Sequence, residues 1–129
     1  MNNKYYLKDK KAQIYEYKDL AEPGDMPQEY YISVSDFPLW CYASQLSQEI
    51  IYQAQSYGSN ETKMFVFNAG TPAKVENYIL YKNKWFQITR SDTKDDYNTD
   101  VFVYAAEVPA GDEPDESFIK PHGWTPEQG

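Results

Sequence analysis

Apolar and polar side chains alternate over several short stretches of the chain. In KAQIYEYK, Ala12 and Ile14 fall on one side and Tyr15 and Tyr17 on the other, which is the period-two pattern of a strand. The compact apolar run LWCYA fits a buried strand. The same reading, applied along the chain, predicts strands at residues 11–18, 39–43, 62–68, 78–81, 85–89 and 101–107.

Two of these stretches, YILY and WFQIT, are separated by a polar triplet and predict a β-hairpin. Within the triplet, Asn83 is the residue best able to adopt a positive φ angle. Polar loops are expected at 21–28, where Pro23 and Pro27 interrupt the chain, and at 91–100.

The hydrophobic period changes between the second and third of these strands. Leu46, Ile50, Ala54 and Tyr57 recur at i, i+4, i+8 and i+11, which predicts a helix over about residues 46–57.

The ends of this helix carry residues suited to helix termini. Ser47 is placed to act as the N-cap and Gly58 to end the helix. We expect the apolar face, with Ile50 and Ala54, to be buried. The fold class is therefore mainly β: a small antiparallel β-barrel of five to six strands with one inserted short α-helix.

Composition divides the chain near Val108. Residues 1–108 form the predicted barrel domain, whereas residues 109–129 are acidic and rich in proline and glycine, which predicts a flexible tail. The tail also carries Phe118, Ile119 and Trp124. Three large apolar side chains are what a segment needs to dock in a groove on a neighbour, so docking on a neighbour is the alternative to a free tail.

Charge and hydropathy restrict the function classes. The formal net charge is -8, with 20 acidic side chains against 12 Lys and Arg, and such a balance disfavours a protein that wraps nucleic acid. No window reaches the ~18 consecutive apolar residues of a membrane span, and the polar start of the chain does not fit a signal peptide. We expect no membrane partner and a protein retained in the cell that makes it.

The residues that usually carry catalysis are scarce and scattered. Cys41 falls within an apolar strand and His122, the one histidine, falls in the tail. Asp95 and Asp96 are adjacent acids in a polar loop, where carboxylates are normally solvated. Nucleotide-binding glycine motifs are absent from the sequence. We therefore expect no catalytic residues, no metal site and no cofactor, and an enzyme is the least favoured class.

Tyrosine is unusually frequent, with 13 residues, and several of them crowd the first quarter of the chain. Tyr tolerates one packed side and one wet side, so these residues fit a protein-protein contact surface, or alternatively a cover for a small barrel. The candidate contact aromatics are Tyr5, Tyr6, Tyr15, Tyr17, Tyr30 and Tyr31.

The order of elements from Leu39 to Glu107 resembles the head-closure proteins of long-tailed bacteriophages, also called stopper or head-tail joining proteins. LWCYAS leads into SQEIIYQAQS, which is similar to the family's helix, and TKMFVFN, YILYKNKWFQIT and VFVYAAE are similar to the strands that follow. With the upstream strand AQIYEYK, the resemblance covers about residues 11–107. Asn83 stands where the family turn usually has glycine, and the acidic tail has no counterpart.

The resemblance implies a small barrel that docks as a self-associated ring under the portal and its adaptor after DNA packaging. Such a ring retains the genome, lets DNA pass nearby without specific binding, and presents the surface to which the phage tail-end proteins attach. The implied location is the virion neck, after synthesis in the cytoplasm of a bacterial host. The candidate gating segment comprises the flanks of the helix, with residues Gln45, Ser47, Gln48, Glu49, Gln55, Ser56 and Asn60.

Two alternatives remain at this point. The chain fits another ring of the phage neck or tail, such as an adaptor or tail terminator, because small phage barrels share pattern and size. Its acidity also fits a DNA mimic that inhibits a host protein, a role that needs carboxylates spaced like phosphates over one face.

Overall fold

The structure, a computed structural model, describes residues 7–26, 28–56, 58, 60–92 and 100–125. Each of the six predicted strands is present, and the structure adds two more. The elements in chain order are β1 (Lys10–Asp19), β2 (Glu29–Ser33), β3 (Leu39–Gln45), α1 (Gln48–Ser56), β4 (Lys63–Asn68), β5 (Tyr78–Tyr81), β6 (Lys84–Asp92), β7 (Asp100–Glu107), the short 3-10 helix η2 (Glu116–Phe118) and β8 (Ile119–Lys120). Most of the loop expected at 91–100 lies outside the described residues.

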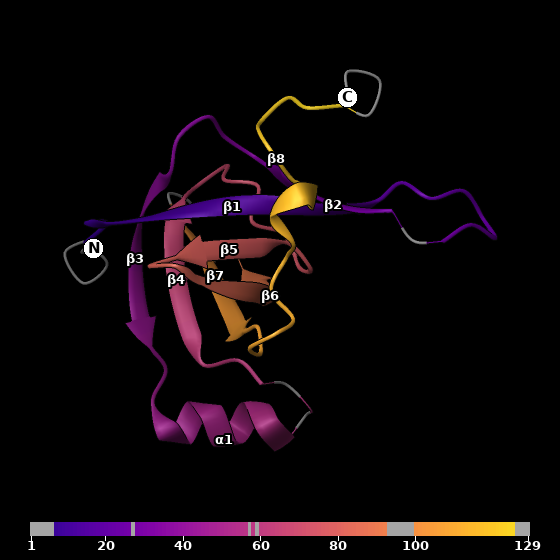
Figure 1. The fold of residues 1–129 in the computed structure, drawn as a ribbon. Helices are drawn as coiled ribbons and strands as arrows, with labels where there is room; N and C mark the ends of the chain where they lie inside the picture. Colours follow the sequence, from indigo (N-terminus) through magenta and orange to yellow (C-terminus); the bar gives the residue numbers. More distant parts are fainter. Residues whose placement is uncertain (1–6, 27, 57, 59, 93–99, 126–129) are drawn as a thin grey trace.

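Six of the strands close into an antiparallel barrel (Figure 1). Neighbouring strands follow the order β3, β4, β7, β6, β5, β1, and β1 then pairs with β3. In this closing pair Lys10 lies opposite Cys41 and Ala12 opposite Leu39. The mainly-β barrel with one short helix that the sequence predicts is therefore confirmed, with six strands in the closed part.

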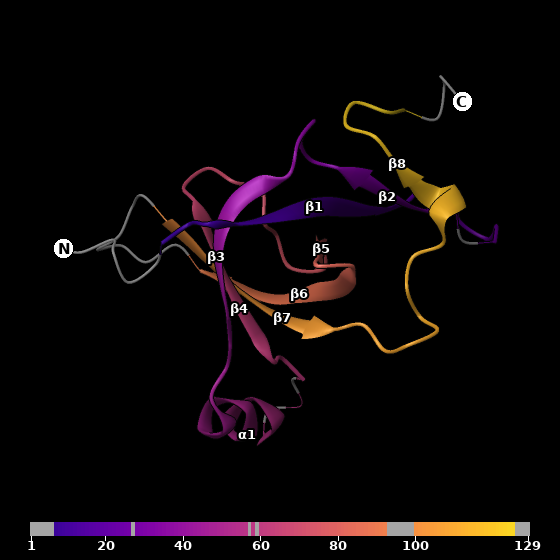
Figure 2. The ribbon, with the colours of Figure 1, turned by 60° about the vertical axis from the view of Figure 1, so that its left-hand side comes forward.

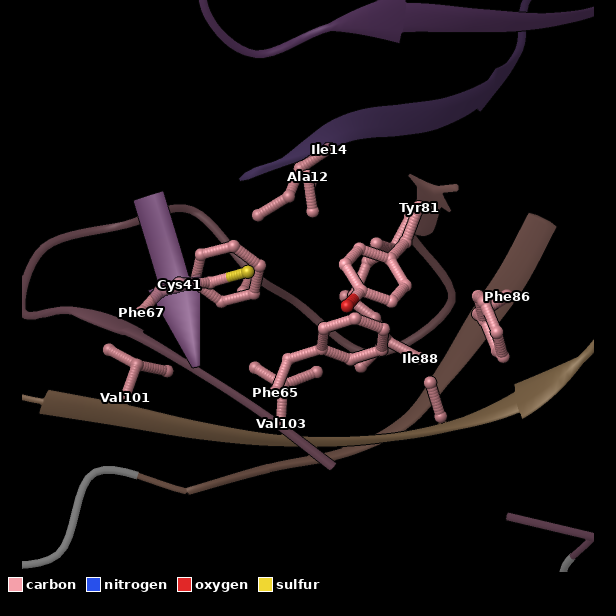
Figure 3. Close-up of a cluster of buried hydrophobic side chains, with 13 residues drawn as sticks. Ala12, Ile14, Cys41, Phe65, Phe67, Tyr81, Phe86, Ile88, Val101 and Val103 are labelled. Atoms are coloured by element: carbon pink, nitrogen blue, oxygen red, sulfur yellow. The ribbon is translucent and has the colours of Figure 1, made fainter. Parts of the chain in front are cut away.

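The interior of the barrel is filled by aromatic and branched side chains from all six of its strands (Figure 3). Phe65 of β4 is fully buried and meets three other rings: Phe67 with centroids 6.2 Å apart, Tyr81 at 5.4 Å and Phe86 at 5.6 Å. Edge-to-face aromatic pairs add to the stability gained by burying their area. Phe65 thus links side chains of β4, β5 and β6 in one packed centre.

The hairpin between β5 and β6 has the turn that the sequence predicts. Its two turn residues, Lys82 and Asn83, have φ angles of 50° and 65°. Two successive positive φ angles define the type I′ turn, whose twist matches that of the flanking strands. The positive φ expected at Asn83 is confirmed, and Lys82 shares it.

Strand β2, which the sequence analysis did not predict, lies outside the barrel. The second half of β1 runs past the barrel and pairs with β2 from Tyr15 opposite Ser33 to Asp19 opposite Glu29. This hairpin projects sideways from the barrel in Figure 1, and β8 adds to its outer edge. Figure 2 shows β8 and the tail beside β2, with α1 at the opposite end of the molecule.

Two ion pairs with buried carboxylates join segments far apart in the sequence. Lys8 Nζ lies 2.6 Å from Asp100 Oδ1, which links the start of the chain to β7, and Arg90 Nη2 lies 2.7 Å from Glu61 Oε1. Asp100 and Glu61 are both nearly inaccessible to solvent. Removing either cation would leave a buried carboxylate with fewer partners, which is strongly unfavourable.

Replacing the central aromatic should unfold the barrel more readily than replacing an exposed one. We expect Phe65→Ala to lower the free energy of unfolding by about 3–5 kcal/mol, because it leaves a cavity where three rings meet. Urea denaturation followed by circular dichroism measures this loss. The matched control is Phe37→Ala, whose ring is 76% exposed and whose effect should stay within about 0.5 kcal/mol. Equal losses in the two variants would contradict the packing described here.

Candidate functional site

The segment between β3 and β4 leaves the barrel and returns to almost the same point. Gln45 and Lys63 are opposite each other at the ends of the two strands, and the Leu46 amide donates to the Thr62 carbonyl oxygen at 2.9 Å. Thr62 is in turn bonded to β7 through its amide and the carbonyl oxygen of Ala105. These paired residues, Gln45, Leu46, Thr62 and Lys63, form a neck that joins both ends of the segment to the barrel. We call residues 47–61 the helical excursion.

The helix of the excursion begins and ends as its sequence predicts. The Ile50 amide donates to Ser47 Oγ at 3.3 Å, so Ser47 is the N-cap. At the other end, Gly58 has a φ of 82° and its amide donates to the carbonyl oxygen of Gln55, which is a usual way for a helix to stop. Tyr57, expected on the apolar face, lies outside the described residues.

The apolar face of α1 is only partly covered, which corrects one prediction. Ala54 is buried and Leu46 is buried just before the helix, but Ile50 is 39% exposed and Tyr52 is 69% exposed. The periodicity identified a face whose end positions, Leu46 and Ala54, are buried, while Ile50 between them is not. Figures 1 and 2 both show α1 set apart from the strands rather than lying across them.

The candidate gating residues lie along this excursion and its neck. They are exposed to solvent, and their polar groups are engaged mainly within the helix itself; Ser56 Oγ, for example, donates to the carbonyl oxygen of Gln53 at 2.6 Å. The exposed set is Gln45, Ser47, Gln48, Glu49, Gln55, Ser56 and Asn60. The structure therefore gathers the predicted residues on one projecting unit.

A cationic pocket that the sequence analysis did not anticipate lies beside the neck. It has a volume of about 330 Å³, and its lining includes Lys63, Lys82 and Lys84. Lys63 and Lys82 both place their ammonium groups near the Tyr81 ring, at 5.7 and 5.4 Å from its centroid, where the ring face favours a cation. Three of the chain's 12 Lys and Arg residues thus gather at one place. In the sequence, the two lysines of the turn YKNK are visible as a pair, but their proximity to Lys63 is visible only in the fold.

The candidate contact aromatics are largely used within the chain. Tyr15 packs on Trp85 with centroids 5.1 Å apart, and Tyr17 packs on Tyr31 at 5.6 Å while its hydroxyl donates to Glu29 at 2.9 Å. These contacts engage the rings within the chain, and a contact surface for another protein stays a prediction. Tyr5 and Tyr6 lie outside the described residues.

The acidic tail docks against β2 through its three large apolar residues and their neighbours. Ile119 and Lys120 pair with Tyr31 and Ile32 in parallel register. The remaining aromatic contacts converge on Tyr30, whose ring lies 4.8 Å from that of Trp124 and 6.1 Å from that of Phe118. Residues 118–124 of the tail therefore dock on their own chain, whereas the alternative left open by the sequence was docking on a neighbour.

The residues examined for chemistry occupy structural positions. Cys41 is fully buried, and burial raises the pKa of its thiol to about 12, so the thiol stays protonated near neutral pH. His122 Nδ1 lies 3.1 Å from Asp36 Oδ1 and ties the tail to the β2–β3 connection. Asp95 and Asp96 lie outside the described residues.

In the part of the chain that the structure describes, the His, Cys, Asp and Glu side chains form no group of three or more that could hold a metal ion. Nor does any helix in those residues have the length and apolar character needed to cross a membrane.

Comparison with known proteins identifies a similar fold. No protein-family model matches the chain, and no curated protein does. The solution structure of protein SF1141 from Shigella flexneri 2a superposes with a TM-score of 0.62 at 11% identity, covering 78% of this chain and 93% of that one. That likeness shows the fold alone. The protein xkdH from the phage-like element PBSX of Bacillus subtilis aligns over 76% of this chain and 92% of its own at 18% identity, but its TM-score of 0.47 supports no argument.

Charge substitutions on the two faces of α1 should have unequal effects. We expect Ile50→Asp to lower the free energy of unfolding by less than about 1 kcal/mol, because the side chain is partly exposed and an acid near a helix N-terminus is favourable. Ala54→Asp should cost about 2 kcal/mol or more, because it buries an unpaired charge. Urea denaturation, with circular dichroism at 222 nm, compares the two. A larger loss for Ile50→Asp would place that residue in the core after all.

Alkaline pH should lower the free energy of unfolding. Burial raises the pKa of Tyr31 to about 12 from an ordinary 10.0, and that of Cys41 to about 12 from 9.0. The folded protein holds these protons more tightly than the unfolded chain, so stability is intact below about pH 9 and falls as the pH rises toward 12. Urea midpoints between pH 8 and pH 11.5 measure the fall. Tyr31→Phe should make it shallower, and an unchanged slope would contradict the contribution of Tyr31.

Proposed function

We propose that this chain is a structural connector of a bacteriophage or prophage, a head-closure protein that assembles as a ring beneath the portal and adaptor, retains the packaged genome and provides the tail attachment surface. The proposal combines the resemblance over residues 11–107 with two features of the structure, the exposed helix α1 and the distribution of charge. The activity proposed is mechanical and requires no catalytic step.

The observation that carries the proposal is the helical excursion. A helix of this length is marginal in water without packing, yet α1 leaves Ile50 and Tyr52 exposed. The excursion is also closed at its neck by the Leu46–Thr62 hydrogen bond, so it can change position without opening a strand pair of the barrel. A closing ring needs a projecting unit of this kind, one that can meet a neighbour or move toward the axis.

Charge is distributed in a way that suits contacts between identical copies. The cationic pocket of Lys63, Lys82 and Lys84 lies beside the neck, whereas Asp112, Glu113, Asp115 and Glu116 make the tail acidic. A ring requires two different faces on each copy that fit one another. Opposite charges on two faces favour such head-to-tail contacts and select their orientation.

The acidic balance also agrees with passage of DNA. The net charge of -8 leaves few cations to hold phosphates, and strong phosphate contacts would hinder ejection. In this proposal the polar flanks of α1 line or border the channel, and the aromatic β1–β2 hairpin faces away from it. The genome is then held by occlusion rather than by specific binding.

Deletion of the gene from the phage that encodes it tests the proposal. Electron microscopy of the lysates shows heads and tails, and nuclease protection measures the DNA that the heads retain. We expect emptied or leaking heads beside complete, unattached tails. Full heads with missing or malformed tails would assign the chain to another ring of the neck or tail, and normal virions would favour the DNA mimic; either result overturns head closure.

Complementation with point variants makes this experiment specific to the excursion. We expect Tyr52→Ala to reduce infectious particles about tenfold or more, as loss of an exposed aromatic anchor does at interfaces, while leaving the thermal midpoint of the purified protein unchanged. The matched control is Gln53→Ala, which alters the adjacent exposed position of the same helix and should complement fully. Full complementation by Tyr52→Ala would remove α1 from the assembly.

A further inference from the structure

The tail is held to the rest of the molecule at one short site. Backbone pairing is confined to Ile119 and Lys120 on the edge of β2. The side-chain contacts converge on Tyr30: Phe118 and Trp124 pack against its ring, and the Lys120 ammonium lies 6.0 Å from its centroid. The hydrogen bond between His122 Nδ1 and Asp36 Oδ1 completes the attachment. We call residues 116–124 the docking segment and the β2 surface that receives it the docking edge.

The chain that leads to the docking segment stands away from the barrel. The Val108 amide donates to the carbonyl oxygen of Trp85. Beyond it, within the described residues 109–115, the hydrogen bonds are local: the Asp112 amide donates to the carbonyl oxygen of Pro109, and the Gly111 amide donates to Glu113 Oε1. A hollow of about 440 Å³ separates this linker from β2. The linker therefore contributes little to holding the tail in place.

The walls of this hollow carry acidic groups. Glu29 comes from β2, and Asp112, Glu113 and Asp115 come from the linker. None of the residues that line it is a lysine or arginine. The lining therefore supplies no cation that would hold the linker to β2, and the residues of the docking segment at its end are exposed or half-buried.

The docking edge is independent of the barrel core. Strand β2 lies outside the six closed strands and pairs with β1 on one side and β8 on the other. Removing β8 uncovers an unpaired strand edge, which readily accepts another strand, but it breaks no barrel pair. The sequence best suited to refill that edge is the docking segment itself, and every copy of the chain carries one.

We propose that the docking segment exchanges between copies, so that residues 116–124 of one chain seat on the docking edge of a second copy. The contacts within the exchanged site are those already present in one chain, which is why such exchange costs little. Residues 109–115 reach about 23 Å when extended at ~3.3 Å per residue, enough to cross to an adjacent copy. The exchange supplies a lateral link for an assembly of any kind, whether or not that assembly is a phage connector.

Disulfide trapping between two variants, each with one added cysteine, tests the exchange in the full-length protein. One chain carries Ile32→Cys and the other, distinguished by a mass tag, carries Lys120→Cys; these positions are register partners in the β2–β8 pair, at a spacing that suits a disulfide. The two are mixed at high concentration, incubated, oxidised and analysed by mass spectrometry. Cys41 is fully buried and does not compete for oxidation.

We expect a disulfide between the two different chains, in an amount that rises with protein concentration and at least tenfold above that of the control mixture. The control pairs Lys120→Cys with Gln53→Cys, an exposed position on α1 at the far end of the molecule. The double variant Ile32→Cys/Lys120→Cys, kept dilute, confirms that the pair can be bridged. A bridge within the dilute double variant but none between the mixed single variants would overturn the exchange. This test is made on purified protein, so its failure would leave head closure standing, and failure of head closure would leave the exchange standing.

Discussion

Residues Lys10–Ala12 of β1 pair with Leu39–Cys41 of β3, and this pairing converts an open six-stranded sheet into a barrel. The buried positions inside depend on this pairing, because Phe65 and the rings around it are shielded from water only when the two end strands of the sheet, β1 and β3, meet. The same strand β1 then continues past the closure to carry β2. One long strand thus serves both the closed core and the open hairpin, and the tail attaches to β2 of that hairpin and to Asp36 just beyond it.

Local signals in the sequence predicted most of the barrel strands and their nearest connections. The β5–β6 turn is fixed by two residues with positive φ, and the α1 N-cap by a hydroxyl three residues from the amide it binds. Such features need no knowledge of distant segments. The period-two pattern of β1 likewise reflects that Ala12 and Ile14 face the core.

What the sequence left open depends on contacts between distant residues. Strand β2 is short, and its partners are the far half of β1 and a two-residue strand near the C-terminus, so no local pattern marks it. Ile50 was expected to be buried because periodicity defines a helix face without showing how far a neighbour covers it. The tail docks because Tyr30 receives Phe118 and Trp124 across more than half the chain, and the cationic pocket forms only when Lys63 meets the β5–β6 turn.

The narrow neck of the helical excursion has a consequence for how the protein can vary. Because Leu46 and Thr62 are already joined at the barrel surface, the barrel strands hold the chain between them chiefly through Glu61, which bonds to Thr89 and Arg90 of β6. Related proteins can therefore lengthen or shorten the excursion ahead of Glu61 while keeping the barrel, since surface loops accept insertions at small entropic cost. The neck is also the natural place to graft a foreign loop or a reporter peptide, with the barrel serving as an unchanged support.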